Sequence, residues 1–218
     1  MKIQVITSKE SWLYNNRKNY LTNFFKKYSK KIKITTVINK IEKNDVLIIL
    51  SFYKIIPKKY LNLSKFNLVA HESNLPNGRG MSPLYTQILN GSDRIVTTIL
   101  EAAERVDSGN FYIKKSFYYP KDIFFEEIKE RQLSNALFLL KKVLIKIIKF
   151  GKIKSYKQIG KPSYYKRRTA NDSEININLS IKKQLNLLRI ADNNNYPVFF
   201  KFKKFKIFLK VKKELNKN

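Results

Sequence analysis

The chain has 218 residues, of which 43% are apolar, and this length suits one domain with a small appendage and a packed core. It contains no cysteine, which excludes disulfide bonds, a cysteine nucleophile and a cysteine-based metal site. The N-terminus carries charge where a secretion signal needs an apolar run, and no apolar stretch reaches the roughly 18 residues of a membrane span. We therefore expect a cytoplasmic protein with no membrane partner.

The formal net charge of +29 has two explanations. Such a field attracts polyanions, including RNA, DNA and acidic membranes. However, only 8 of the 45 basic residues are arginine, which nucleic-acid readers use for bidentate contacts, and the lysines are spread along the chain. Compositional drift toward lysine explains the charge more simply, so we do not expect a nucleic-acid partner.

The first part of the chain alternates between strand and helix patterns. The apolar runs predict strands over 2–7, 32–38, 45–52 and 66–71, and the helical spacing of large apolar residues predicts a helix over 12–28. The run 45–52 is apolar throughout, as in a strand buried on both faces of a sheet. This alternation predicts an α/β fold with a mainly parallel, Rossmann-like sheet flanked by helices.

The pattern breaks after His71. Residues 72–82 contain one proline and two glycines, which predicts a loop at a strand's carboxyl end, the edge where open α/β sheets bind ligands. Pro83 is well placed to begin a short helix that ends at Asn90. Two strands follow, over 94–101 and 110–118, with Asp107 in the turn between them.

A long helix over 121–150 ends the first domain, 1–150. The extension 151–218 comprises a polar loop over 155–172, a short helix over 179–189 and a hairpin over 196–211 that turns near Lys203 and Lys204. The helix over 121–150 is basic and amphipathic, and such a helix can lie on a membrane. The hairpin alternates basic and aromatic residues, a pattern that can bind single-stranded nucleic acid. A helix packed on the sheet and half-buried strands explain both patterns more simply.

His71 and Asp107 are the candidates for chemistry. His71 is the only histidine, and it follows a buried type of strand. Spacing alone is weak evidence for pairing it with Asp107, but neighbouring strands could bring the two together. The chain has no phosphate-binding glycine loop and no nucleophile elbow, and one histidine without cysteine forms no usual zinc site, so we expect no metal. A His/Asp pair can provide acid–base and oxyanion chemistry.

Several segments resemble the folate-dependent formyltransferases. Residues 71–84, HESNLPNGRGMSPL, resemble the signature loop of that family, which includes the catalytic domain of methionyl-tRNA formyltransferase. Residues 51–57, SFYKIIP, resemble the segment that lines the folate pocket, and residues 100–112 resemble the aspartate segment. Residues 164–174 and 188–197 resemble the tail of the sugar N-formyltransferase branch.

The resemblance implies formyl transfer from 10-formyltetrahydrofolate to the amino group of a nucleotide-linked amino sugar, as in polysaccharide biosynthesis. A protonated His71 would stabilise the developing oxyanion, and Asp107 would keep His71 charged and help move the amine proton. The implied folate contacts are Lys54, Ile55, Ile56, Met81, Ala103 and Asp107. The implied acceptor contacts are Ser73, Asn74, Tyr164, Arg167, Arg168, Asn193 and Tyr196. The resemblance also allows a homodimer.

One position departs from the family pattern. The family usually has an asparagine two residues before the histidine, where this chain has Val69, and Asn74 could substitute for it. A methionyl-tRNA formyltransferase is one alternative, which the charge favours, but only 68 residues follow residue 150, too few for the additional tRNA-binding barrel. A non-catalytic RNA-binding protein on the same fold is the other.

Overall fold

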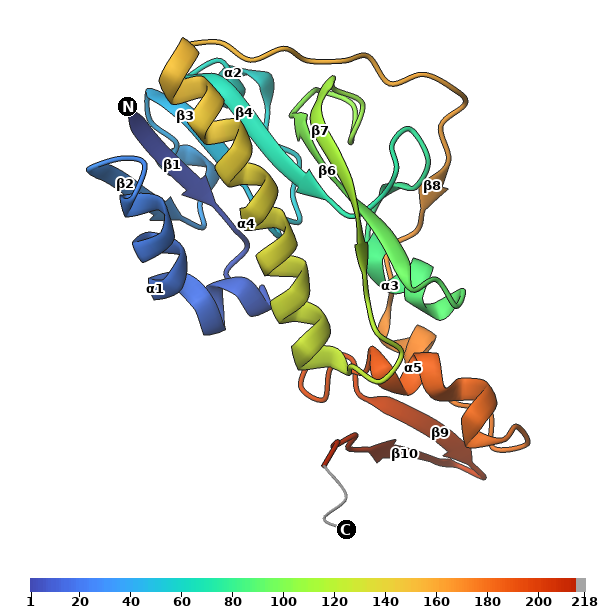
Figure 1. The fold of residues 1–218 in the computed structure, drawn as a ribbon. Helices are drawn as coiled ribbons and strands as arrows, with labels where there is room; N and C mark the ends of the chain where they lie inside the picture. Colours follow the sequence, from blue (N-terminus) through green and yellow to red (C-terminus); the bar gives the residue numbers. More distant parts are fainter. Residues whose placement is uncertain (215–218) are drawn as a thin grey trace.

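A six-stranded mixed sheet organises the chain in the computed structural model, which describes residues 1–214 (Figure 1). The strand order is β2-β1-β3-β4-β6-β7. The pairs β1–β2, β1–β3 and β3–β4 are parallel, and β4–β6 and β6–β7 are antiparallel. The strands are β1 Lys2–Ile6, β2 Lys31–Thr35, β3 Asn44–Ile49, β4 Ser64–His71, β6 Arg94–Glu101 and β7 Phe111–Tyr118. The predicted α/β fold with a mainly parallel sheet is confirmed.

Two helices, α1 (Trp12–Lys26) and α4 (Phe125–Phe150), cover one face of the sheet (Figure 1). Leu21 and Phe25 of α1 and Leu140 and Leu144 of α4 lie in one buried cluster with apolar side chains of β1, β3 and β4. The short elements η1 (Ile38–Lys40) and α2 (Lys58–Leu61) pack against the opposite face. No helix among residues 1–214 is both long and apolar enough to span a membrane.

The C-terminal extension packs against the residues that follow strand β7 of the main sheet. Ile190 lies in a buried cluster with Leu84 and Ile88 of α3 (Pro83–Leu89) and Tyr119, which follows β7. Its elements are β8 Tyr164–Tyr165, η2 Ala170–Ser173, η3 Ile181–Gln184, α5 Leu185–Arg189 and the hairpin strands β9 Val198–Phe202 and β10 Phe205–Leu209. The predicted hairpin is present and turns at Lys203 and Lys204. The last four residues of the predicted extension, 215–218, lie outside the described residues.

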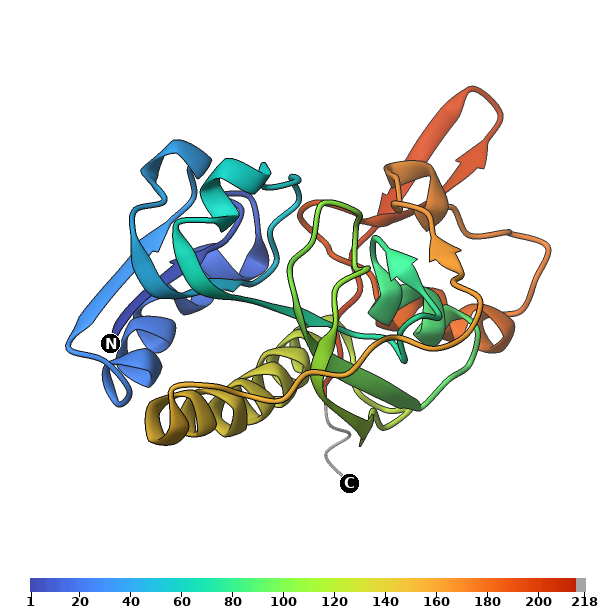
Figure 2. The same cartoon turned by 90° about the horizontal axis from the view of Figure 1, so that it is seen from above.

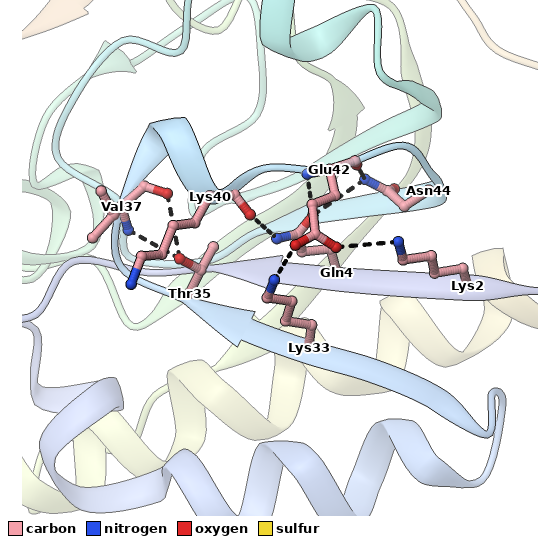
Figure 3. Close-up of polar contacts among 8 residues, drawn as sticks. All are labelled: Lys2, Gln4, Lys33, Thr35, Val37, Lys40, Glu42 and Asn44. Carbon is pink, nitrogen blue, oxygen red and sulfur yellow. Dashed lines mark hydrogen bonds and ion pairs between the residues drawn. The ribbon is translucent and has the colours of Figure 1, made fainter.

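A buried glutamine fastens the chain between β2 and β3 (Figure 3). Gln4 of β1 is fully buried; its amide donates to the Lys40 carbonyl at 2.7 Å and accepts from the Glu42 backbone N–H at 3.0 Å. Glu42 forms ion pairs with Lys33 and Lys2, and these contacts lower the pKa of its carboxyl. These contacts hold the η1 segment against the sheet.

Some boundaries differ from the sequence-based predictions. The strand predicted over 32–38 ends at Thr35, because the Thr35 hydroxyl bonds both backbone groups of Val37 and turns the chain away from the sheet. The long helix begins at Phe125 rather than residue 121, because the Glu127 carboxylate caps the Phe124 N–H at 2.8 Å. The helix predicted over 179–189 is a 3₁₀ turn followed by α5, and the predicted loop 155–172 contains β8.

Arg189 ties the extension to the turn before α4. This guanidinium is 2% exposed and donates to the carbonyls of Pro120 at 2.7 Å and Ile123 at 3.1 Å. We expect Arg189→Met to lower the free energy of unfolding by about 1–3 kcal/mol, because it leaves buried carbonyls without donors. Urea unfolding followed by the fluorescence of Trp12, the only tryptophan, measures this change.

Arg131→Met is the matched control. Arg131 is exposed and also donates to a backbone carbonyl, that of Tyr118, at 3.3 Å. Its loss should change the free energy of unfolding by no more than about 0.5 kcal/mol. Equal losses for the two variants would show that Arg189 does not fasten the extension.

Candidate active site at the end of strand β4

His71 is the last residue of β4, and its side chain is buried beneath the loop that follows. The strand's carboxyl end brings it to the edge of the sheet, as its sequence position predicts. The ring Nε2 lies 2.8 Å from the carbonyl oxygen of Gly78. The other ring nitrogen, Nδ1, lies 3.6 Å from Oδ2 of Asp107, an ion-pair distance somewhat longer than a hydrogen bond. The structure therefore brings the two predicted residues together.

Asp107 is held in place by the loop that covers His71. Its Oδ2 accepts a hydrogen bond from the Gly80 backbone N–H at 2.9 Å. Its own backbone has a φ of 51°, in the left-handed region, which aspartate tolerates better than most residues. Both ring nitrogens of His71 thus face oxygen acceptors, the Gly78 carbonyl and the Asp107 carboxylate.

Two glycines let these turns pass close to neighbouring backbone. Gly80 has a φ of 95°, and a Cβ there would lie 2.6 Å from the Tyr165 carbonyl oxygen. A Cβ on Gly109 would lie only 1.9 Å from the Glu101 carbonyl oxygen. Neither position can hold a side chain without a shift of the backbone. Gly80 thus sets how near the His71 loop comes to β8, and Gly109 sets how near the Asp107 turn comes to the end of β6.

The residue at the position of the missing family asparagine is half-buried against the core. Val69 packs in the apolar cluster with Ile6 and Ile49. Asn74, the suggested substitute, lies on the loop, and its Oδ1 accepts from Lys114 Nζ at 3.2 Å; burial lowers the pKa of the Lys114 ammonium. The predicted acceptor contact Ser73 is 2% exposed, and its hydroxyl has no hydrogen-bond partner within residues 1–214.

The predicted folate contacts lie on segments that meet. Ile56 and Ala102 pack in one apolar cluster, so residues 54–56 lie beside the segment that leads to Asp107. Lys54, Ile55 and Ala103 are exposed. Met81 is joined to the extension through its N–H, which donates to the Tyr165 carbonyl at 3.2 Å. A surface hollow of about 450 Å³ runs along this segment, lined by residues of 58–67 and 101–108.

The predicted acceptor contacts in the extension differ in their exposure and in their hydrogen bonds. Tyr164 is exposed, with its hydroxyl 3.5 Å from Arg79 Nη1. The side-chain amide of Asn193 donates to the Val211 carbonyl at 2.8 Å and accepts from the Val211 N–H at 2.9 Å. These two hydrogen bonds fasten the end of the hairpin. Arg167 is exposed and Tyr196 is half-buried.

Arg168 is half-buried and donates to the Asp172 carbonyl at 3.1 Å, and burial lowers its pKa. Burial raises the pKa of Tyr85 on α3, and the charges of Asp192 and Arg168 act on it in opposite directions. Burial also raises the pKa of Tyr53, on which Tyr196 and Arg167 act. The charged groups of the extension therefore act on side chains of α3 and of the loop after β3.

Some residues near the site were not predicted from the sequence. Glu72 is buried, and burial raises the pKa of its carboxyl, while the neighbouring His71 and Gln132 act to lower it. Lys129 of α4 is also buried, which lowers its pKa, and it donates to Gln132 at 3.0 Å. Gln158, in the predicted loop, bonds the Asp107 turn. Within residues 1–214 no group of three His, Cys, Asp or Glu side chains could hold a metal ion.

Residues 3–144 match the sequence model of the formyl transferase family. The chain belongs to this family. Methionyl-tRNA formyltransferase of Fusobacterium nucleatum subsp. nucleatum is 29% identical over 160 residues, which are 72% of this chain and 49% of that protein. The chain therefore spans about half the length of this curated relative.

Several solved structures share the fold of this chain. Methionyl-tRNA formyltransferase from Clostridium thermocellum has a TM-score of 0.76 and 21% identity, covering 94% of this chain and 90% of that one. A 4-N formyltransferase from Francisella tularensis has a TM-score of 0.70 and 20% identity, covering 98% of both chains. HypX from Aquifex aeolicus in complex with tetrahydrofolic acid has a TM-score of 0.73 and 16% identity, covering 92% of this chain and 36% of that one. The prediction of the formyl transferase family is confirmed, and its similar members come from more than one branch.

The tight packing of Gly109 offers a test of the site's geometry. We expect Gly109→Ala to shift the turn that carries Asp107, because the added Cβ would overlap the Glu101 carbonyl. The overlap should cost about 1–3 kcal/mol in the free energy of unfolding and should move the ring NMR signals of His71, the only histidine.

Gly151→Ala serves as the control, because a Cβ there meets no atom within 4 Å, although its φ of 65° makes the alanine strained. Its His71 signals should coincide with those of the wild type. If Gly109→Ala leaves these signals in place, the turn does not depend on this glycine.

Proposed function

We propose that this chain transfers a formyl group from 10-formyltetrahydrofolate to the amino group of a nucleotide-linked amino sugar. The observation that carries the proposal is the His71–Asp107 pair, with Nδ1 and Oδ2 3.6 Å apart and the Asp107 carboxylate held by the Gly80 N–H, in a chain of the formyl transferase family. A charged imidazole beside a carboxylate suits a reaction in which negative charge develops on a carbonyl oxygen while an amine loses a proton.

The two residues would have complementary roles. When bound, 10-formyltetrahydrofolate would supply the formyl group: the amine would bond to the formyl carbon, the bond from that carbon to the folate nitrogen would break, and tetrahydrofolate would leave with a proton on that nitrogen. His71, as an imidazolium, would stabilise the negative charge that develops on the formyl oxygen. Because its Nε2 lies against Gly78 and its Nδ1 against Asp107, one of these contacts has to open during the reaction. Asp107 would hold the imidazolium in place and accept the proton that the amine loses.

The folate segments have surface features that fit a flat aromatic ligand. Ile55 is 65% exposed and Val106 is 42% exposed, so both predicted segments present apolar side chains to solvent. The backbone between Ala103 and Val106 is on the surface, beside the hollow of about 450 Å³. The hollow itself is lined mostly by polar and charged residues. Exposed apolar side chains with a few polar groups beside them are typical of small-molecule sites. The similar fold of HypX in complex with tetrahydrofolic acid supports the same cofactor here.

Two observations favour a nucleotide sugar as the acceptor. Arg167 and Arg168 are adjacent on the extension, and arginine forks match the oxygens of a diphosphate. The 4-N formyltransferase of Francisella tularensis aligns with 98% of the chain, which includes the extension. A homodimer and a cytoplasmic location stay predictions.

Methionyl-tRNA is the second candidate acceptor. The curated relative from Fusobacterium nucleatum is a methionyl-tRNA formyltransferase, and the net charge of +29 would attract RNA. Such binding would weaken steeply with salt, because lysine–phosphate contacts release counterions. Non-catalytic binding of RNA on the same fold would show the same salt dependence without formyl transfer.

Formyl transfer in vitro tests the proposal. The protein is incubated with 10-formyltetrahydrofolate and either a panel of GDP-, UDP-, dTDP- and CMP-linked amino sugars or methionyl-tRNA, and mass spectrometry detects an added formyl group. We expect product with one amino sugar. His71→Ala and Asp107→Asn should each lower kcat by about a hundredfold or more.

Asp93→Asn is the matched control, because Asp93 lies half-buried in the turn before β6, away from the His71 loop in sequence. It should keep the wild-type kcat. Product with methionyl-tRNA alone would replace the sugar by the second candidate. Absence of any product, together with no folate binding by calorimetry, would contradict the enzymatic proposal.

A further inference from the structure

The extension sends one side chain into the region where the His71 loop and the Asp107 turn meet. After α4 the chain runs back across the molecule toward β8 (Figures 1 and 2). On the way, Tyr156 pairs with Phe111 at the start of β7 through two backbone hydrogen bonds of 2.8 and 2.9 Å, and the two rings stack. This pairing fixes the segment just before Gln158.

The amide of Gln158 is fully used. Its Nε2 donates to the carbonyl oxygens of Asp107 and Gly109, both at 2.7 Å. Its Oε1 accepts from Arg79, with Nη2 at 2.7 Å and Nε at 3.2 Å. The orientation of the amide is unambiguous, because two carbonyls face its nitrogen and a guanidinium faces its oxygen.

These bonds join both sides of the candidate catalytic pair. Arg79 stands between Gly78, whose carbonyl contacts His71, and Gly80, whose N–H holds the Asp107 carboxylate. On the other side, Gln158 bonds the backbone of Asp107 itself, where φ is 51°. A left-handed backbone at a residue other than glycine persists only where its surroundings hold it.

We propose that Gln158 is a positioning residue that sets the distance between Asp107 and His71. This inference rests on the formyl transfer proposed above. Gln158 acts on the reaction only through the turns that it bonds. Because both turns meet on this one amide, its loss frees the Asp107 turn and the Arg79 guanidinium together.

Replacement of Gln158 tests this role. Gln158→Met keeps a similar length but loses all four hydrogen bonds. Gln158→Glu keeps the acceptor for Arg79 but sets a carboxylate against the Asp107 and Gly109 carbonyls. We expect both variants to lower kcat roughly tenfold to a hundredfold, since small misplacements of reacting groups cost this much. The KM values for folate and acceptor should stay near those of the wild type.

Gln184→Met is the matched control. Gln184 makes the same kind of bonds in another turn of the extension, accepting from the Asn176 N–H at 2.7 Å and donating to the carbonyls of Asn176 at 3.0 Å and Leu179 at 3.2 Å. It shares no hydrogen bond with the His71 loop or the Asp107 turn. Its loss should leave kcat unchanged.

The ring NMR signals of His71 give a readout that does not need activity. Because His71 is the only histidine, these signals are unambiguous, and they should move in both Gln158 variants but not in Gln184→Met. If the wild type forms no formylated product, the proposed function fails, while this spectrum still tests the positioning role. If Gln158→Met does not fold, Gln158→Glu provides the same comparison. Unmoved His71 signals, a wild-type kcat, or an equal loss in Gln184→Met would each overturn the inference.

Discussion

The hydrogen bond from the Gly80 N–H to the Asp107 carboxylate is the interaction on which the site depends. It joins two loops that leave the sheet from different strands. For it to form, the chain at residue 80 has to pass within contact of the Tyr165 carbonyl, which only a glycine allows. The short parallel ladder between β5 (Arg79–Gly80) and β8 holds the chain in this position. Beside it, the Arg79 N–H donates to the Ser163 carbonyl at 2.9 Å. The extension therefore supports the geometry of His71 as well as packing beside it.

The sheet explains why the loop before Asp107 has to be long. Strand β6 runs antiparallel to β4, so Thr98 pairs with His71 while Glu101, at the end of β6, pairs with Leu68. The chain leaves β6 away from the histidine and has to return before Asp107 can approach it. Residues 102–106, which make this return, are mostly exposed and include the predicted folate contact Ala103. The same return loop thus presents a surface for the cofactor and brings the carboxylate to His71.

The sequence predicted the elements that have strong local patterns. Continuous apolar runs identified the strands, and the lone His71 and the glycine-containing Asp107 turn stood out at strand ends. The two-residue strand β8 was not predictable, because it pairs with β5 from 85 residues away in the chain and has no periodicity. Gln158 was missed for the same reason, since it lies in a polar stretch without a pattern. Lys129 was also missed: it is a buried lysine of α4, and its hydrogen bond to Gln132, three residues along the same helix, gives no distinctive pattern in the sequence.

The most direct test of the account is whether folate binds beside His71. Tetrahydrofolate is titrated into the wild-type protein while the ring NMR signals of His71 and the heat of binding are followed. The account predicts that the His71 signals move along the same saturation curve as the heat. Folate binding that leaves the His71 signals unchanged, or no binding at all, would contradict the assignment of this site.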